Sequence, residues 1–182
     1  MRFFRSRKPA SCSIRGVGIR RFLASLALLA AAPAALAFDA NGVALGGREG
    51  EIKKAFPSAH CKPLEWKTDA ADRRCDDGRI AFGGVPAKIT FYLKAGAIQA
   101  FDVRFDTADH QKVAAHLKGR WGAPLAEATE TIGRRDGGER KVYKLRWEKG
   151  RDYAVLSAQL ERKRATLEVW RGAFADEVYR VR

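Results

Sequence analysis

The feature that most constrains the fold of this chain is a series of short segments in which apolar and polar residues alternate. In residues 88–94, Ile89, Phe91 and Leu93 occupy every second position. This period of two puts them on one face of a β-strand and their neighbours on the other. Residues 98–105 repeat the pattern, and the glycine-containing turn before them predicts that the two segments form a hairpin.

Further strands are expected on the same grounds, separated by turns rich in glycine and charged residues. They are predicted at residues 61–67, 79–82, 126–132, 141–148, 153–160 and 166–170, with a strand or turn at 42–45.

Two helices interrupt the predicted strands. The first spans residues 48–56, where Ile52 and Phe56 lie four positions apart on one face. The second spans residues 107–121, begins at Thr107 as an N-cap and carries an apolar stripe at four-residue steps. Residues 173–182 are expected to form a short closing helix.

This order of elements predicts the α+β class. We expect two successive helix-then-strands units, at about residues 43–105 and 106–182, that together form a single domain over residues 38–182. Runs of strands without strict β-α-β alternation favour an antiparallel sheet with the helices packed on one face.

The first 37 residues have the pattern of a cleaved signal peptide. Seven Arg or Lys residues and no acid precede the apolar run at residues 22–32, and Ala35 and Ala37 form a small-x-small cleavage site before Phe38. The apolar run is too short to span a membrane, which needs about 20 residues. The sequence therefore predicts export to the periplasm or beyond, with no membrane span after cleavage.

The basic part of this signal is long, and two explanations stay open. Arg20 and Arg21 could belong to a loose twin-arginine signal. Alternatively, translation could start at Val17 rather than Met1, which would leave a compact signal.

Removal of the signal also changes the charge. The full chain has a formal charge of +14, whereas residues 38–182 hold 28 Lys and Arg against 21 acids, a net of +7. A basic protein in the cell envelope would meet acidic proteins and anionic lipids or polymers, and its charge would speed association with them. We expect an envelope protein or an anionic envelope ligand as partner and no nucleic acid.

Cys61 and Cys75 are the cysteines that remain after cleavage. Two cysteines in an oxidising compartment predict a disulfide, which would close a 15-residue loop and stabilise the fold by about 3 kcal/mol. The alternatives are a redox pair or a metal site that includes His60, but the spacing matches no redox motif and further ligands are missing.

No pattern in the chain predicts catalysis. His110 and His116 lie on different helical faces, so they do not form an i, i+4 metal pair. Ser58 and Ser157 lack the glycines of a nucleophile elbow. We therefore expect no enzyme activity, no cofactor and no metal.

The sheet face turned away from the helices is the predicted binding surface. Period-two geometry places aromatic residues and arginines there, and these residue types dominate protein-binding hot spots. The candidate partner-binding residues are Tyr92, Arg104, Arg146, Tyr153 and Trp170. The alternative is that the C-terminal tail covers the aromatic residues and that the basic residues only solvate the sheet.

The segment Val113-x-x-x-Leu117-x-x-x-Trp121-Gly122-x-Pro124, followed by antiparallel strands, resembles the helix-to-sheet segment of small bacterial envelope proteins. Among these are the β-lactamase inhibitory protein and the small lipoprotein of the outer-membrane barrel-assembly machine, although no lipid-attachment cysteine stands at residue 38. The resemblance implies a protein-interaction module, either an inhibitor or an envelope-assembly accessory.

Overall fold

The computed structural model describes residues 38–133 and 137–181, with side chains up to residue 178. They all belong to one compact unit. The expected signal peptide at residues 1–37, with Ala35 and Ala37 of its cleavage site, lies outside the described residues.

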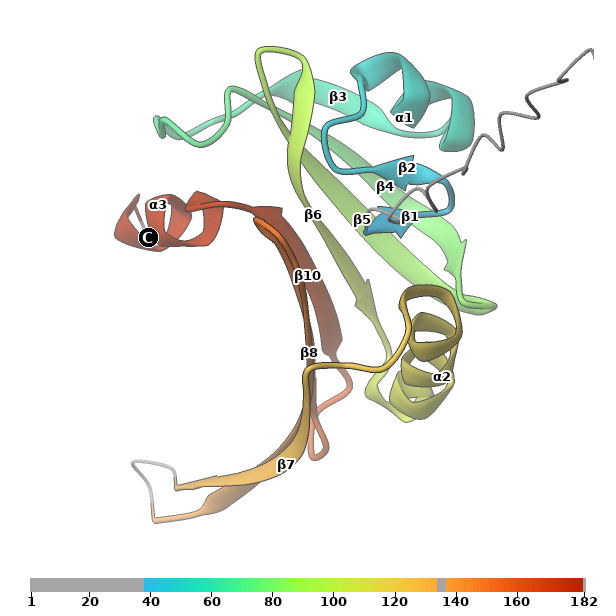
Figure 1. Ribbon diagram of the computed structural model, residues 1–182, viewed down its shortest axis with the longest axis vertical. Helices are drawn as coiled ribbons and strands as arrows, with labels where there is room; N and C mark the ends of the chain where they lie inside the picture. Colours follow the sequence, from blue (N-terminus) through green and yellow to red (C-terminus); the bar gives the residue numbers. More distant parts are fainter. Residues whose placement is uncertain (1–37, 134–136, 182) are drawn as a thin grey trace, which may run out of the picture. The chain divides into compact units, whose positions relative to one another are not determined.

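One large antiparallel sheet dominates the described chain (Figure 1). Its eight strands lie in the spatial order β3-β4-β5-β6-β10-β9-β8-β7. Their bounds are β3 His60–Pro63, β4 Arg73–Phe82, β5 Val85–Lys94, β6 Ala97–Phe105, β7 Ala126–Gly133, β8 Glu139–Lys149, β9 Asp152–Gln159 and β10 Ala165–Arg171. A separate two-stranded ribbon pairs β1 (Asp39–Ala40) with β2 (Val43–Ala44). The antiparallel sheet and the α+β class are confirmed.

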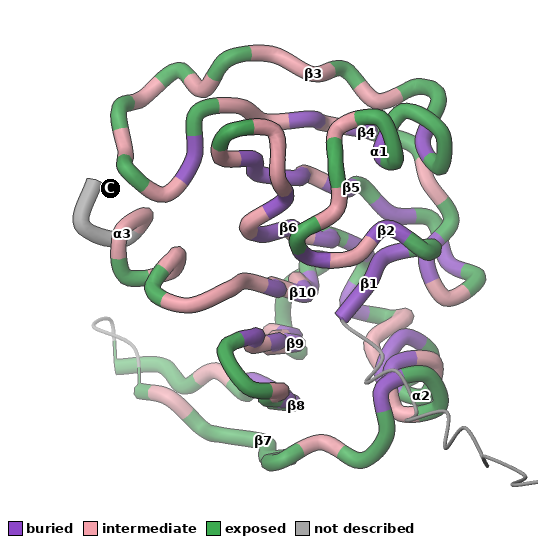
Figure 2. Tube along the Cα trace, turned by 45° about the horizontal axis from the view of Figure 1, so that its top comes forward, coloured by how far each residue is buried: buried purple, intermediate pink, exposed green. Residues whose placement is uncertain are grey.

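Two helices cover one face of the sheet. Helix α1 is Glu49–Ala55, and the single 3-10 turn η1 (Thr107–Asp109) leads into α2, His110–Trp121. Ile52 of α1 and Leu117 of α2 are fully buried in the main core together with Phe91 and Phe101 of the sheet. Figure 2 shows α2 buried along one side and exposed along the other, as an amphipathic helix on a sheet requires.

The third helix, α3 (Phe174–Val181), lies on the opposite face of the sheet (Figure 1). Its Phe174 packs against a second apolar cluster that contains Tyr92, Ala100 and Trp170, whereas Phe91, the neighbour of Tyr92, belongs to the main core. The expectation that all helices pack on one face is therefore wrong. The apolar residues on the second face give α3 a surface on which to bury its own aromatic ring. We call this side of the sheet the α3 face.

The predicted division into two helix-then-strands units also needs correction. Along the chain, α1 precedes β3–β6 and α2 precedes β7–β10, but the helices are few and short. In space, the pairing of β6 with β10 joins all eight strands into one continuous sheet, from Ala165 opposite Phe105 to Trp170 opposite Ala100.

Several element ends differ from the prediction. Asp106, not Thr107, caps the helical turn, since its carboxylate accepts a hydrogen bond of 2.9 Å from the backbone N–H of Ala108. Strand β3 ends at Pro63 rather than at residue 67, and β4 begins at Arg73 rather than at residue 79. Strand β9 ends at Gln159, so Leu160, expected as its last residue, lies exposed after it.

Candidate binding surface

The α3 face presents three rows of side chains that run across the strands, each row fixed by the strand register. The aromatic row is Arg74, Tyr92, Ala100, Trp170, Tyr153 and Glu148. The acidic row is Asp76, Thr90, Asp102, Glu168, Val155 and Arg146. The basic row is Lys88, Arg104, Thr166, Ser157 and Lys144.

The aromatic row holds the three predicted aromatic residues, and Phe174 of α3 packs over part of it. Tyr92 is only 5% exposed, and its ring lies 5.5 Å from the ring of Phe174. Tyr153 and Trp170 stack on each other with ring centroids 5.7 Å apart. A small hollow of about 120 Å³ remains between this row and α3. Tyr92 is therefore closed to a partner, whereas Tyr153 and Trp170 are half-buried.

The two predicted arginines lie apart from this aromatic cluster. Arg146 ends the acidic row and forms an ion pair with Glu148, whereas Arg104 lies exposed in the basic row. The structure therefore brings Tyr92, Tyr153 and Trp170 together but not Arg104 and Arg146.

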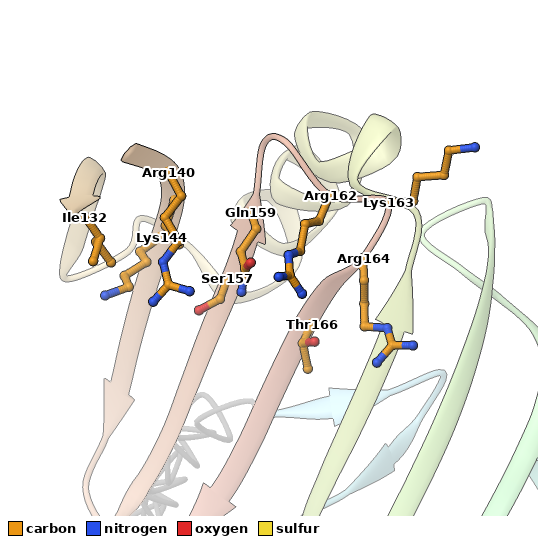
Figure 3. A pocket seen from close by; sticks show the side chains of 10 residues that line it. Ile132, Arg140, Lys144, Ser157, Gln159, Arg162, Lys163, Arg164 and Thr166 are labelled. Atoms are coloured by element: carbon orange, nitrogen blue, oxygen red, sulfur yellow. The ribbon is translucent and has the colours of Figure 1, made fainter. Parts of the chain in front are cut away.

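A larger hollow lies over β7–β10 at the end of the α3 face away from α3, and we call it the basic hollow (Figure 3). Its volume is about 800 Å³. Ten residues line it: Ile132, Arg140, Val142, Lys144, Ser157, Gln159, Arg162, Lys163, Arg164 and Thr166.

Positive charge dominates the basic hollow. Five of the lining residues are Arg or Lys, and none of the lining residues carries a carboxylate. Lys144 pairs with Glu130 of β7 at 2.6 Å, whereas Arg140, Arg162 and Arg164 form no ion pair with any other described residue. The Nε of Arg140 is buried without a hydrogen-bond partner in the described part of the chain.

The hairpin between β9 and β10 carries three of these cations and is held against β8. The Leu160 N–H donates to the Lys141 carbonyl at 2.9 Å, and the Lys141 N–H donates to the Glu161 carboxylate at 2.8 Å. These bonds hold the hairpin beside Arg140. In Figure 3 the side chains of Arg162 and Arg164 point along the face, whereas Lys163 points away from them.

This arrangement suits an anion. Guanidinium groups offer planar pairs of N–H donors that match phosphate, sulfate and carboxylate oxygens, and charge-assisted hydrogen bonds of this kind are stronger than neutral ones. Ser157, Gln159 and Thr166 add neutral donors on the floor of the hollow. The lining therefore offers charged and neutral hydrogen-bond donors to an anion from β8, β9, β10 and the hairpin between β9 and β10.

The sequence reasoning missed Arg140, Arg162, Lys163 and Arg164 as site residues. The run of three cations at residues 162–164 was visible, but a charged run between strands is typical of a solvated turn. One signal could have revealed the hollow. The three consecutive cations lie in a hairpin loop, and the adjacent strand β8 carries two more outward-facing cations, Arg140 and Lys144.

The structure offers little support for other chemistry in the described residues. No group of three or more His, Cys, Asp and Glu side chains in residues 38–133 and 137–178 is placed to hold a metal ion. His110 bonds through Nδ1 to the Thr107 carbonyl at 2.7 Å, and His116 packs edge-on against Phe82. No helix in the described part is long and apolar enough to cross a membrane.

Cys61 and Cys75 form a disulfide, as predicted from the sequence. The two residues face each other directly in the β3–β4 pair, and Cys75 is fully buried.

Comparison with known proteins identifies no relative of this chain. No family model, curated protein or solved structure matches this chain. The function is therefore inferred from the chain's own geometry.

Proposed function

We propose that this is a non-catalytic binding protein of the bacterial cell envelope and that its basic hollow binds an anionic ligand. The observation that carries the proposal is the lining of that hollow: five cations with no carboxylate among them. Arg140 and Arg162 supply guanidinium groups from β8 and from the β9–β10 hairpin, so a ligand between them would receive donors from two elements.

The environment of Arg140 favours a ligand-binding role for the hollow over a basic surface that is only solvated. Arg140 is half-buried with its Nε unpaired within the described chain. A buried donor without a partner costs about 1–3 kcal/mol, and an anion in the hollow would relieve that cost. This nitrogen, together with the five cations of the lining, supports an anion-binding role for the hollow.

The proposal is tested by titrating tripolyphosphate into the protein in a calorimeter at low salt. The variant Arg162→Gln/Arg164→Gln removes two exposed charges from the hairpin and should weaken binding about tenfold or more, since each charge-assisted bond contributes about 1.5–3 kcal/mol. The matched control, Lys54→Gln/Lys112→Gln, removes two exposed charges from the helix-covered side and should bind as the unmodified protein does. Equal losses in both variants would mean that only net charge matters and would refute a site in the hollow.

A protein-interaction module is the second candidate function. The stacked pair Tyr153 and Trp170 favours it, because half-buried aromatic residues are frequent anchors of protein interfaces. The resemblance to the β-lactamase inhibitory protein and the assembly lipoprotein stays a hypothesis that implies the same role. Salt separates the candidates, since an ion-binding site weakens steeply with added salt and an aromatic interface does not.

We also propose that residues 1–37 are a cleaved signal peptide and that the protein works in the periplasm. Phe38, the expected first mature residue, is fully buried and packs 4.9 Å from the ring of Trp121, so the chain is part of the core from this residue on. Sequencing the N-terminus of protein released from the periplasm should give Phe38, and retention of residues 1–37 would contradict the proposal.

A further inference from the structure

The basic row of the α3 face extends well beyond the basic hollow. Lys88 of β5 faces Arg104 of β6, which faces Thr166 of β10, and the row continues through Ser157 of β9 to Lys144 of β8. Five neighbouring strands therefore contribute one side chain each. With strands spaced about 4.8 Å apart, the row measures roughly 19 Å from end to end.

A second hollow, of about 790 Å³, lies at the Lys88 end of this row. It is lined by Arg79, Lys88 and Arg104 among others, and by Lys163 and Arg164 of the β9–β10 hairpin. The hairpin residues Lys163 and Arg164 line the basic hollow as well. The two hollows therefore share a wall of cations, and together they form one basic track across the sheet.

Acidic groups border the track. The carboxylates of Asp76, Asp102 and Glu168 lie in the acidic row, two residues along the strands from the basic row. They would repel a negative ligand that approached the aromatic row. Asp106 is the one carboxylate among the residues that line the second hollow, and it accepts a hydrogen bond from the Ala108 N–H as the cap of η1. The acidic row therefore favours a ligand that lies across the strands, along the basic row.

We propose that the ligand of this site is a linear polyanion, a chain with negative charges repeated along its length, which lies across the sheet from β8 to β5. This inference rests on the proposed function of the basic hollow and names the class of its ligand. A compact anion contacts only the cations within one side-chain reach of it. Lys88 and Lys144 lie at opposite ends of the row, so they cannot both contact the same small anion.

The middle of the track also fits an extended chain. Thr166 and Ser157 lie between the charged ends of the row, and their hydroxyls are half-buried donors on the sheet surface. Arg162 and Arg164 stand beside them on the hairpin. A chain crossing the sheet would therefore meet a donor on every strand from β5 to β8.

The experiment compares anions of one chemistry and increasing length: pyrophosphate, tripolyphosphate and long-chain polyphosphate. Affinity per chain should rise from the first to the last, because longer chains reach the Lys88 end of the track. The variant Lys88→Gln/Arg104→Gln, which lies outside the basic hollow, should weaken the long chain about tenfold and leave pyrophosphate nearly unchanged. Lys54→Gln/Lys112→Gln is again the charge-matched control.

The outcomes separate this inference from the proposed function. If pyrophosphate and long chains bind equally well, or if Lys88→Gln/Arg104→Gln weakens both equally, the extended track is refuted while the anion site stands. If no polyphosphate binds, both proposals fail. Circular dichroism of each variant checks that a loss of binding is not a loss of fold. Lys54, Lys88 and Arg104 make no side-chain hydrogen bond within the described chain, and Lys112 donates one to the Gly84 carbonyl.

Discussion

At the scale of single residues, Tyr143 shows how burial and a charged neighbour act together on one group. Its ring is 6% exposed and lies 5.3 Å from the ring of His110, and its hydroxyl donates a hydrogen bond of 2.6 Å to Glu127 of β7. Burial first, and then the nearby Glu127 carboxylate, raise the pKa of Tyr143 well above the usual tyrosine range. The neutral phenol is therefore the form that the fold requires.

The raised pKa of Tyr143 predicts a loss of stability in alkali. Below about pH 10 the tyrosine is protonated in both the folded and the unfolded chain, so its contribution is fully present. Above that pH the unfolded chain releases the proton while the folded chain holds it, and the free energy of unfolding falls. Urea unfolding at a series of pH values should show this decline.

Substitution of Tyr143 gives the specific test. Tyr143→Phe should cost about 1 kcal/mol near neutral pH through the lost hydrogen bond, and it should flatten the decline above pH 10. Tyr153→Phe, the same change on the α3 face, controls for the loss of a hydroxyl. An alkaline decline in Tyr143→Phe as steep as in the unmodified protein would show that another group is responsible.

At the scale of elements, the disulfide ties an edge strand to the sheet. Strand β3 has β4 as its one neighbour, and the Cys61–Cys75 bond crosses that pair. The loop between the two strands, residues 64–72, is also held by non-covalent contacts: the Asp72 N–H donates to the Leu93 carbonyl at 2.8 Å, and Ala71 is buried in the second apolar cluster. The covalent link adds to the order that these contacts give to this part of the chain.

Removing that link should destabilise the whole domain. The chain-entropy model gives a loss of about 3 kcal/mol for a loop of this length, so Cys61→Ala/Cys75→Ala should unfold at clearly lower urea concentration. Reductant should shift the unmodified protein by a similar amount and should leave the double variant unchanged. Unfolding curves that do not respond to reductant would contradict a stabilising role for the bond.

The sequence predicted those elements whose pattern is local. The alternation of apolar and polar residues located β5 and β6, because Ile89, Phe91 and Val103 are core residues that alternate with polar ones. It missed the start of β4, because Arg73 and Arg74 are charged residues beside a polar loop and owe their strand conformation to pairing with Leu93 and Tyr92 of β5.

At the scale of the whole domain, the feature that no local pattern could predict is the pairing of β6 with β10. Sequential strands usually pair with each other, whereas these two are separated by α2 and three strands. Their register places Arg104 opposite Thr166 and so aligns cations from both parts of the chain. The extended basic row follows from this alignment, whereas the basic hollow itself is lined by residues of β7–β10 alone.

The aromatic residues illustrate the same limit. Period-two reasoning placed Tyr92 and Trp170 on the correct face, but it could not decide between an open surface and one covered by the tail. The structure places Phe174 of α3 over Tyr92, at a ring distance of 5.5 Å. Tyr92 is consequently closed to a partner, and basic residues such as Lys88 and Arg104 are among the most exposed on the α3 face.

The central claim is that the basic hollow receives the anion, and chemical-shift mapping by nuclear magnetic resonance tests it most directly. Tripolyphosphate titrated into isotope-labelled protein should move the amide signals of Ser157, Arg162 and Thr166 while those of α1 and α2 stay in place. Shifts confined to α1 and α2, or spread evenly over all basic residues, would contradict a binding site on the α3 face.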